Sequence, residues 1–164
     1  MRDFNNYITK SKKLKKRVLL FTLFVIILVA CEKDDFCVKN PITPNLVLRF
    51  YDTNNRETLK SVSSFYVWAE GKDTIFNNVS IDSLYIPLNS LANETIYNFS
   101  TGNVVNQFTI KYIPKEEYVS RSCGFRVLFN EVTFESSNTW ISDFTPETLI
   151  TIDNQNSAHV QIFH

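Results

Sequence analysis

The chain has 164 residues, which is enough for one ordinary domain in addition to a targeting segment. A hydrophobic content of 44% can build a core and excludes a wholly disordered chain, and 14% aromatic residues with only three glycines favour β-structure. The net charge of zero conceals an uneven distribution, because residues 1–30 hold seven of the 17 basic and one of the 17 acidic residues. The remainder therefore carries about −6, which argues against nucleic acid as a partner.

The first 31 residues have the three parts of a secretory signal. A basic stretch ends at Arg17, an apolar run follows over residues 18–29, and Ala30 precedes Cys31. The apolar run is well short of the ~20 residues that a membrane-spanning helix needs. An uncleaved membrane helix with a coincidental cysteine is the alternative interpretation.

The end of the apolar run resembles the bacterial lipobox at all four positions, Leu28, Val29, Ala30 and Cys31. The resemblance implies that residues 1–30 are a cleaved lipoprotein signal peptide. In proteins of that kind the thiol of Cys31 would receive a diacylglyceryl group, and the amine freed by cleavage is usually acylated as well. Two or more acyl chains give stable anchoring, because each buried methylene adds about 0.8 kcal/mol.

The residues directly after Cys31 resemble the surface-export signal of Bacteroidota lipoproteins, in which a lysine and acidic residues follow the lipidated cysteine. In this chain these residues are Lys33, Asp34 and Asp35. By that resemblance the protein would be anchored in the outer membrane and face the cell surface. The alternatives are an acidic, solvated tether without an export role and a protein that faces the periplasm.

The mature chain consists of short apolar segments that alternate with polar residues and are separated by turns, a pattern typical of β-strands. Strands are expected at residues 46–51, 65–69, 74–76, 83–86, 95–99, 107–112, 125–129, 132–134, 149–152 and 159–163. The alternation is clearest in 107–112, where Phe108, Ile110 and Tyr112 are expected to point inward. The break in phase at Asn130 and Glu131 predicts a β-bulge.

Turn residues predict hairpins around 70–73 and 101–103, and a closing hairpin around 153–156. No segment shows sustained helical periodicity, since the one candidate, 88–95, is too short to stand alone. The prediction is therefore all-β: a single antiparallel β-sandwich, immunoglobulin-like or transthyretin-like, over residues 46–164. Residues 31–45 would form the lipidated tether and lead-in.

Lipidation of Cys31 would leave two cysteines, Cys37 and Cys123, in a compartment that permits disulfides. A bridge between them would tie the lead-in to the strand that follows Cys123. It would be worth up to about 4–5 kcal/mol in the chain-entropy model. The alternative is a nucleophilic Cys123 with a pKa lowered by Arg121, which would need His159 or His164 as its base.

The sequence contains no glycine-rich phosphate loop, no G-x-S-x-G elbow and no HExxH or CxxC metal pattern. We therefore expect no cofactor, no metal and no catalytic residues. His159 is expected to be a surface or hydrogen-bonded strand residue. Glu131 and Glu135 could share a strand face, but exposed carboxylates of this kind usually serve solubility.

Aromatic side chains could form an exposed binding platform. Tyr66 and Trp68 share one strand face, opposite Phe65 and Val67, and could stack on sugar rings, although we expect them in the core or an interface. Trp140 is expected in a loop.

Arg121 and Arg126 could bind an anion, but we expect them to pair with surplus carboxylates. Two Asp-(Ser/Thr)-apolar triplets resemble the motif at which Bacteroidota O-glycosylate exported proteins, which makes Thr74 and Ser83 candidate glycan sites.

Taken together, several motifs resemble a family of small Bacteroidota outer-membrane lipoproteins of unknown function. They are the residues 28–35, the entry 43–46, the segment 120–126 and the closing segment 159–164. The resemblance brings no catalytic residues. It implies a non-enzymatic, lipid-anchored module that binds or supports a protein or glycan partner at the cell envelope. An envelope hydrolase with an unrecognised active site is the alternative.

Overall fold

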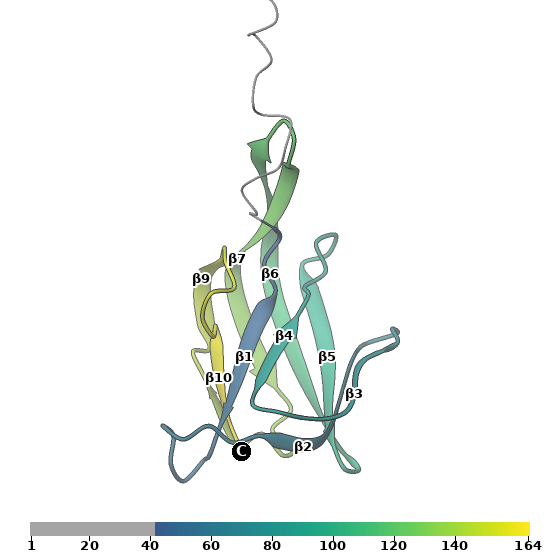
Figure 1. Ribbon diagram of the computed structural model, residues 1–164, viewed down its shortest axis with the longest axis vertical. Coiled ribbons are helices and arrows are strands. Elements are labelled where there is room, and N and C mark those ends of the chain that lie inside the picture. The colour runs from purple at the N-terminus through teal and green to yellow at the C-terminus, as the bar shows by residue number, and fades with distance from the viewer. Residues whose placement is uncertain (1–41) are drawn as a thin grey trace, which may run out of the picture. The chain divides into compact units, whose positions relative to one another are not determined.

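The computed structural model describes residues 42–164, which form ten strands and no helix and so confirm the predicted all-β class (Figure 1). The strands are β1 (Leu46–Tyr51), β2 (Val62–Ala69), β3 (Thr74–Ile81), β4 (Ser83–Ile86), β5 (Glu94–Thr101), β6 (Val104–Ser120), β7 (Gly124–Ser136), β8 (Asp143–Thr145), β9 (Thr148–Ile152) and β10 (Val160–Phe163). All of them belong to one compact unit, whereas the turn residues Arg121–Cys123 are grouped with a second unit.

The strands form two sheets that pack face to face as the predicted β-sandwich. The first sheet has the strand order β4-β1-β10-β8, and the second has the order β3-β2-β5-β6-β7-β9. Every pairing between these strands is antiparallel, as predicted, except that β1 and β10 run parallel, with Leu48 beside Val160. These two strands are far apart in the sequence, so no tight hairpin turn imposes an antiparallel direction on them.

The core lies between the sheets and is largely aromatic. The predicted inward face of β6 is buried, with Phe108, Ile110 and Tyr112 at most 3% exposed, and Leu46, Leu48 and Phe50 of β1 are fully buried as well. Four rings form a stacked row across β5, β6 and β7, with centroid separations of 5.7–6.2 Å, in the order Tyr97, Phe99, Phe108 and Phe134. Each such ring pair adds about 0.5–1.5 kcal/mol beyond the burial of its apolar area.

The predicted bulge in β7 is confirmed. Lys111 of β6 pairs with Thr133, and two residues later Ile113 pairs with Asn130, so β7 contains one extra residue. Glu131 adopts the left-handed backbone conformation there, with φ of 52°. This extra residue explains why the apolar alternation of β7 changes phase along the strand.

The predicted closing hairpin is wrong, because β9 and β10 belong to different sheets. β9 pairs with β7 in the second sheet, and β10 lies between β1 and β8 in the first. Residues 153–159 therefore cross from one sheet to the other instead of forming a tight turn. Ile152 at the end of β9 and Val160 at the start of β10 are both fully buried, so the two strands contribute to the same core from different sheets.

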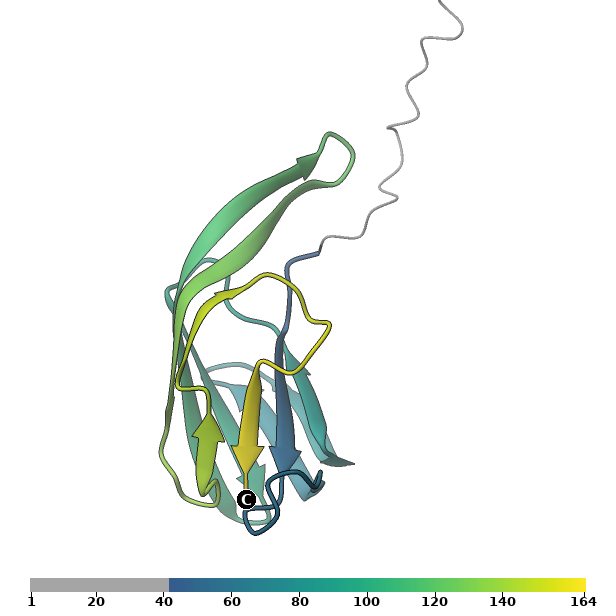
Figure 2. The ribbon, with the colours of Figure 1, turned by 90° about the vertical axis from the view of Figure 1, so that its left-hand side faces the viewer.

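The hairpin of β6 and β7 continues past its neighbours. β5 pairs with β6 only as far as Lys111, and β9 pairs with β7 only as far as Phe129. Beyond these points β6 and β7 pair only with each other, up to Ser120 and Gly124. Figure 2 shows this two-stranded extension in green, at the end of the domain where β1 begins.

Candidate functional site

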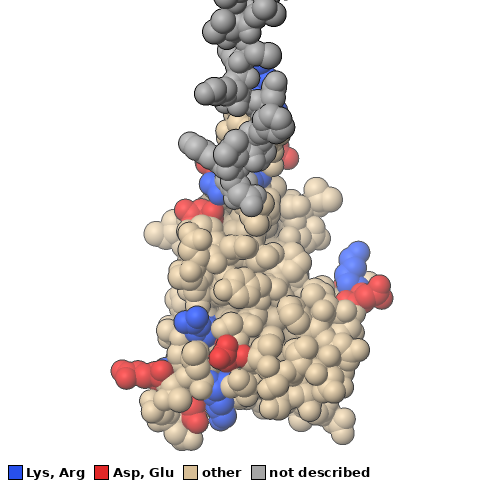
Figure 3. Space-filling model, viewed as in Figure 1, with Lys and Arg blue, Asp and Glu red and all other residues tan. Residues whose placement is uncertain are grey.

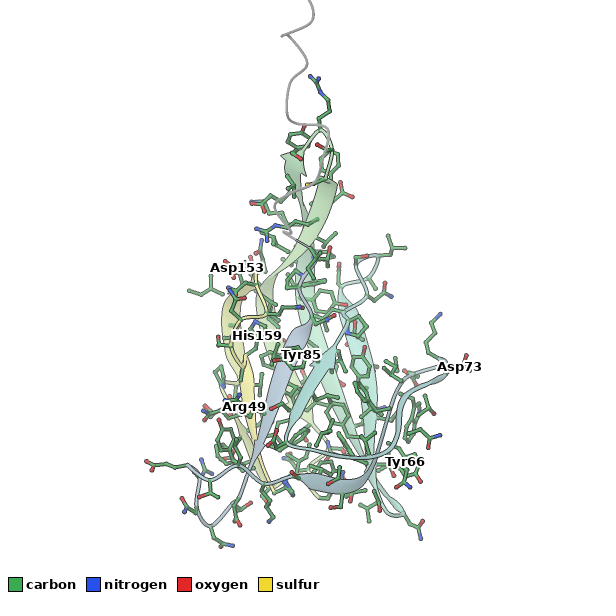
Figure 4. All side chains as sticks on the ribbon, in the orientation of Figure 1. Arg49, Tyr66, Asp73, Tyr85, Asp153 and His159 are labelled. Atoms are coloured by element: carbon green, nitrogen blue, oxygen red, sulfur yellow. The ribbon has the colours of Figure 1, made fainter. Side chains whose placement is uncertain are left out.

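Tyr66 and Trp68 lie on the outer face of the second sheet. Their strand neighbours Phe65 and Val67 are completely buried, so the intervening side chains point away from the core and are half-buried. Of the two places expected for the Tyr–Trp pair, the core is therefore wrong, and an interface stays a prediction. Both faces of β2 carry large apolar side chains, and alternation alone does not reveal which of two apolar faces turns inward. Figure 4 labels Tyr66 on β2.

Amide side chains continue this face across the next two strands. Trp68 pairs with Asn98 of β5, and Asn98 pairs with Gln107 of β6, which is exposed. We call Tyr66, Trp68, Asn98 and Gln107 the aromatic–amide face. Trp68 and Gln107 are two strand spacings apart, which is about 10 Å. Within the described residues, no hydrogen bond engages either amide side chain, so their donors and acceptors are available to a ligand.

Farther along β6 and β7, one lysine and one glutamate form an ion pair. Lys111 Nζ donates to Glu135 Oε1 at 2.6 Å, and both side chains are largely exposed. The hydrogen bond and charge of Glu135 raise the pKa of Lys111. Glu131 lies in the bulge of the same strand, so the strand face that it could have shared with Glu135 is interrupted there. Glu135 is thus engaged by Lys111, and Glu131 lies at the bulge.

His159 connects two parts of the backbone. The N–H of Val47 donates to its Nδ1 at 2.9 Å, and its Nε2 lies 2.8 Å from the carbonyl oxygen of Asn154. This pattern requires a neutral ring with the proton on Nε2. Burial lowers the pKa of His159, which favours the same neutral state. The expectation of a hydrogen-bonded residue is confirmed, and Figure 4 places His159 close to Asp153 at the connection between β9 and β10.

Trp140 closes one end of the core. Its Nε1–H donates to the carbonyl oxygen of Phe99 at 3.0 Å, and its ring lies 5.9 Å from Phe65 and 5.6 Å from His164 between centroids. His164 Nε2 lies 3.1 Å from the carbonyl oxygen of Lys60, and burial lowers its pKa as well. The loop position predicted for Trp140 is correct, but no sequence pattern indicates that this loop folds back over the core.

Arg126 pairs with a carboxylate, as expected. Its Nε donates to Glu117 Oε2 at 2.5 Å, and its Nη1 donates to the carbonyl oxygen of Asp153 at 3.0 Å. With its donors used in this way, Arg126 holds the extended hairpin against the segment after β9. Arg121 is exposed in the turn between β6 and β7.

The outer face of the first sheet presents fewer side chains suited to binding a ligand than the aromatic–amide face does. Tyr85 of β4 is 49% exposed, and Arg49 of β1 is exposed beside Ser83 and Gln161. Figure 3 shows that charged side chains are sparse over β1, β4 and β10. The aromatic side chains Tyr51 and Phe163, farther along β1 and β10, contact each other, and Arg56 covers the Phe163 ring.

Several predicted site residues lie outside the described residues. These are the lipobox Leu28, Val29 and Ala30, the lipidation site Cys31, the export signal Lys33, Asp34 and Asp35, and Cys37. Cys123, the predicted partner of Cys37, lies in the turn between β6 and β7. The disulfide between them therefore remains a prediction.

The two predicted glycan sites differ in accessibility. Thr74 is exposed at the start of β3, the edge strand of the second sheet. Ser83 is half-buried at the start of β4, and its Oγ donates to Asp82 Oδ1 at 3.0 Å. Thr74 is thus the more accessible candidate.

Residues 42–164 contain neither a membrane-spanning helix nor a cluster of metal ligands. No helix in this part of the chain is long and apolar enough to cross a bilayer. No group of three or more His, Cys, Asp or Glu side chains in the same range could hold a metal ion.

Comparison with known proteins identifies a family but no individual relative. No match was found among curated proteins or among solved structures. A family model does match residues 64–164, a range that begins within β2 and includes the whole aromatic–amide face. Because the match covers more than half of the chain, the protein belongs to a family of unknown function (DUF6452).

Proposed function

We propose that the protein is a non-enzymatic binding module, anchored to the outer membrane through acyl chains on Cys31, that binds uncharged glycan at its aromatic–amide face. The observation that carries the binding role is the outward orientation of Tyr66 and Trp68 next to amides that no described residue engages. The anchoring rests on the lipobox, and the surface orientation rests on the export signal at Lys33–Asp35.

The anchor has a direct chemical test. The mature protein purified from cell envelopes is expected to begin at Cys31 and to carry a diacylglyceryl group, which mass spectrometry of the amino-terminal peptide detects. Globomycin, which blocks the lipoprotein signal peptidase, is expected to leave residues 1–30 attached. A mature amino-terminal peptide without acyl chains would contradict the anchor.

The chemistry of the aromatic–amide face fits a neutral saccharide. Aromatic rings with one exposed side offer an apolar platform, and amides supply both donors and acceptors for hydroxyl groups. Lys111 pairs with Glu135, so this lysine presents no uncompensated charge to an anionic ligand. An exposed sheet face also suits an extended chain of sugar rings better than a small molecule, which usually requires a concave pocket.

Affinity electrophoresis in gels that contain neutral polysaccharides tests this binding face. We expect dextran, mannan, laminarin or xyloglucan to retard the mature chain, and we expect Trp68→Ala to abolish the retardation. Ile150→Ala is the matched control, because Ile150 is 90% exposed on β9, at the opposite edge of the sheet from β2 and β3. Equal mobility of the wild type and Trp68→Ala in every gel would reject the glycan proposal.

The engagement of the histidines supports a non-enzymatic role. A hydrolase that used Cys123 would need a base, and His159 and His164 are the two histidines of the chain. Both ring nitrogens of His159 are bound by backbone groups, and Nε2 of His164 is bound by the carbonyl oxygen of Lys60. No observation favours the envelope hydrolase over the binding module.

A further inference from the structure

The extended hairpin of β6 and β7 carries an exposed aromatic pair. Tyr118 and Phe125 pair directly across the hairpin, and their rings meet edge to face with centroids 5.3 Å apart. They are 60% and 66% exposed, so the contact between the two rings leaves most of their apolar surface uncovered. The pair lies beyond the last residues at which β5 and β9 support the hairpin, Lys111 and Phe129.

The chain that follows the lipid anchor enters the domain beside this hairpin. The N–H of Val127 donates to Thr43 Oγ1 at 2.9 Å, so the entering segment reaches the folded domain along β7. Thr43 lies twelve positions after Cys31, and even fully extended this stretch of chain spans at most ~40 Å. From Val127 the hairpin continues for a few more residue pairs, at about 3.3 Å per residue. The aromatic pair is therefore within reach of any bilayer that holds Cys31.

The charge of the hairpin also differs from that of the rest of the domain. Residues 113–126 contain three basic and two acidic residues, whereas the whole of 42–164 contains eight basic and 13 acidic residues. An anionic membrane surface repels acidic surfaces and attracts basic ones over about one Debye length. Because basic residues outnumber acidic ones in the hairpin, an anionic membrane surface does not repel this part of the domain.

From these observations we infer that the hairpin of β6 and β7 rests against the bilayer in which Cys31 is anchored, with Tyr118 and Phe125 in the headgroup region. Aromatic side chains favour this interface, where one side of the ring is apolar and the other is hydrated. The contact would orient the sandwich and turn the far end of the domain away from the membrane. This inference rests on the proposed lipid anchor, since a chain without acyl groups would not be held close enough.

Quenching by brominated lipids tests the contact in the full acylated chain. Phe125→Trp and the control Val104→Trp are each reconstituted in vesicles of phosphatidylethanolamine and phosphatidylglycerol at about 3:1, with and without brominated acyl chains. Val104 is 48% exposed and begins β6, beside the β5–β6 turn and therefore at the opposite end of that strand. The native Trp68 and Trp140 contribute equally to both samples.

We expect brominated lipid to quench the added indole of Phe125→Trp at least about twofold more than that of Val104→Trp, as an interfacial position requires. Equal quenching in variants that float with the vesicles would overturn the membrane contact and leave the anchor intact. Failure of both variants to float would overturn the anchor itself, and the contact with it.

Discussion

His159 shows how a side chain that looks catalytic in a sequence can serve the fold. Its two ring nitrogens join Val47 of β1 to Asn154 in the segment that crosses between the sheets. A protonated ring would have a hydrogen on Nδ1 directed at the N–H of Val47, and this contact would change from a hydrogen bond to a repulsion. The neutral state is therefore part of the folded structure.

The stability of the domain should consequently depend on pH. Burial lowers the folded-state pKa of His159 below its ordinary value, so the unfolded state binds a proton first as the pH falls. Its stabilising contribution is full above about pH 6.5 and is lost as the pH falls through and below that value. His164 shifts in the same direction and adds to the effect.

We expect the thermal unfolding midpoint to fall between about pH 7.5 and about pH 5.5, and to fall less in His159→Asn. Asparagine keeps an acceptor for the N–H of Val47 but does not titrate. Calorimetry at several pH values measures both midpoints. An equal fall in the two proteins would assign the pH dependence to His164 or to carboxylates instead.

The inward face of a strand was predictable where one face is apolar and the other polar, and it was not predictable where both faces are apolar. β6 alternates cleanly, and its inward residues are the expected ones, whereas β1 buries Val47 on its outer face as well as Leu46, Leu48 and Phe50 on its inner face. In β2 the strand was predicted correctly but its inward face was not, because Tyr66 and Trp68 carry extensive apolar surface, as Phe65 and Val67 do. β8 has only three residues, Asp143–Thr145, which is too short for any alternation to show.

Strand pairing was predictable only where a turn joins the partners. The hairpins β2–β3 and β5–β6 follow from the turn residues between them. The partners of β10 are β1, which is more than 100 residues away, and β8. The length of residues 153–159 allows either a hairpin or a crossing between sheets, and only packing of the complete core selects the crossing.

The backbone strain at the bulge in β7 can be tested by substitution. Glu131 has φ of 52°, a conformation that costs a residue with a side chain roughly 1–2 kcal/mol but costs glycine little. We expect Glu131→Gly to stabilise the domain by up to about 1 kcal/mol in chemical denaturation, after the greater backbone entropy of unfolded glycine is subtracted.

The control is Gln161→Gly. Gln161 is exposed in β10 and is not among the residues with positive φ. Glycine at a regular strand position should destabilise the domain by about 0.5–1 kcal/mol. Destabilisation of similar size in both variants would show that the bulge conformation of Glu131 is not what limits stability.

On the scale of the whole molecule, the second sheet carries both proposed contacts, at two different places. The aromatic–amide face lies on β2, β5 and β6, and the proposed membrane contact lies on the extension of β6 and β7. β6 takes part in both, because its 17 residues run from Val104 to Ser120. The proposed location follows from the first 35 residues alone, whereas the binding face required knowledge of which side of β2 is buried.

The predicted disulfide would connect the lead-in covalently to the tip of the extended hairpin. In the acylated, unfolded protein without reductant, we expect no thiol to react with a maleimide, because the Cys31 sulfur carries lipid and Cys37 is joined to Cys123. Cys37→Ser should expose one reactive thiol and lower the free energy of unfolding by up to about 4–5 kcal/mol. Two reactive thiols in the wild type would reject the bridge.

The parallel pairing of β1 with β10 also constrains when the protein can fold. β10 is inserted between β1 and β8, so the first sheet remains incomplete until β10 itself has been synthesised. A nascent domain of this kind would emerge with β1 lacking its central neighbour and with Leu48 and Phe50 uncovered. Because such non-local closure is slow, the emerging chain would leave these side chains exposed, and the backbone around them open to proteolysis, until β10 joins β1 and β8.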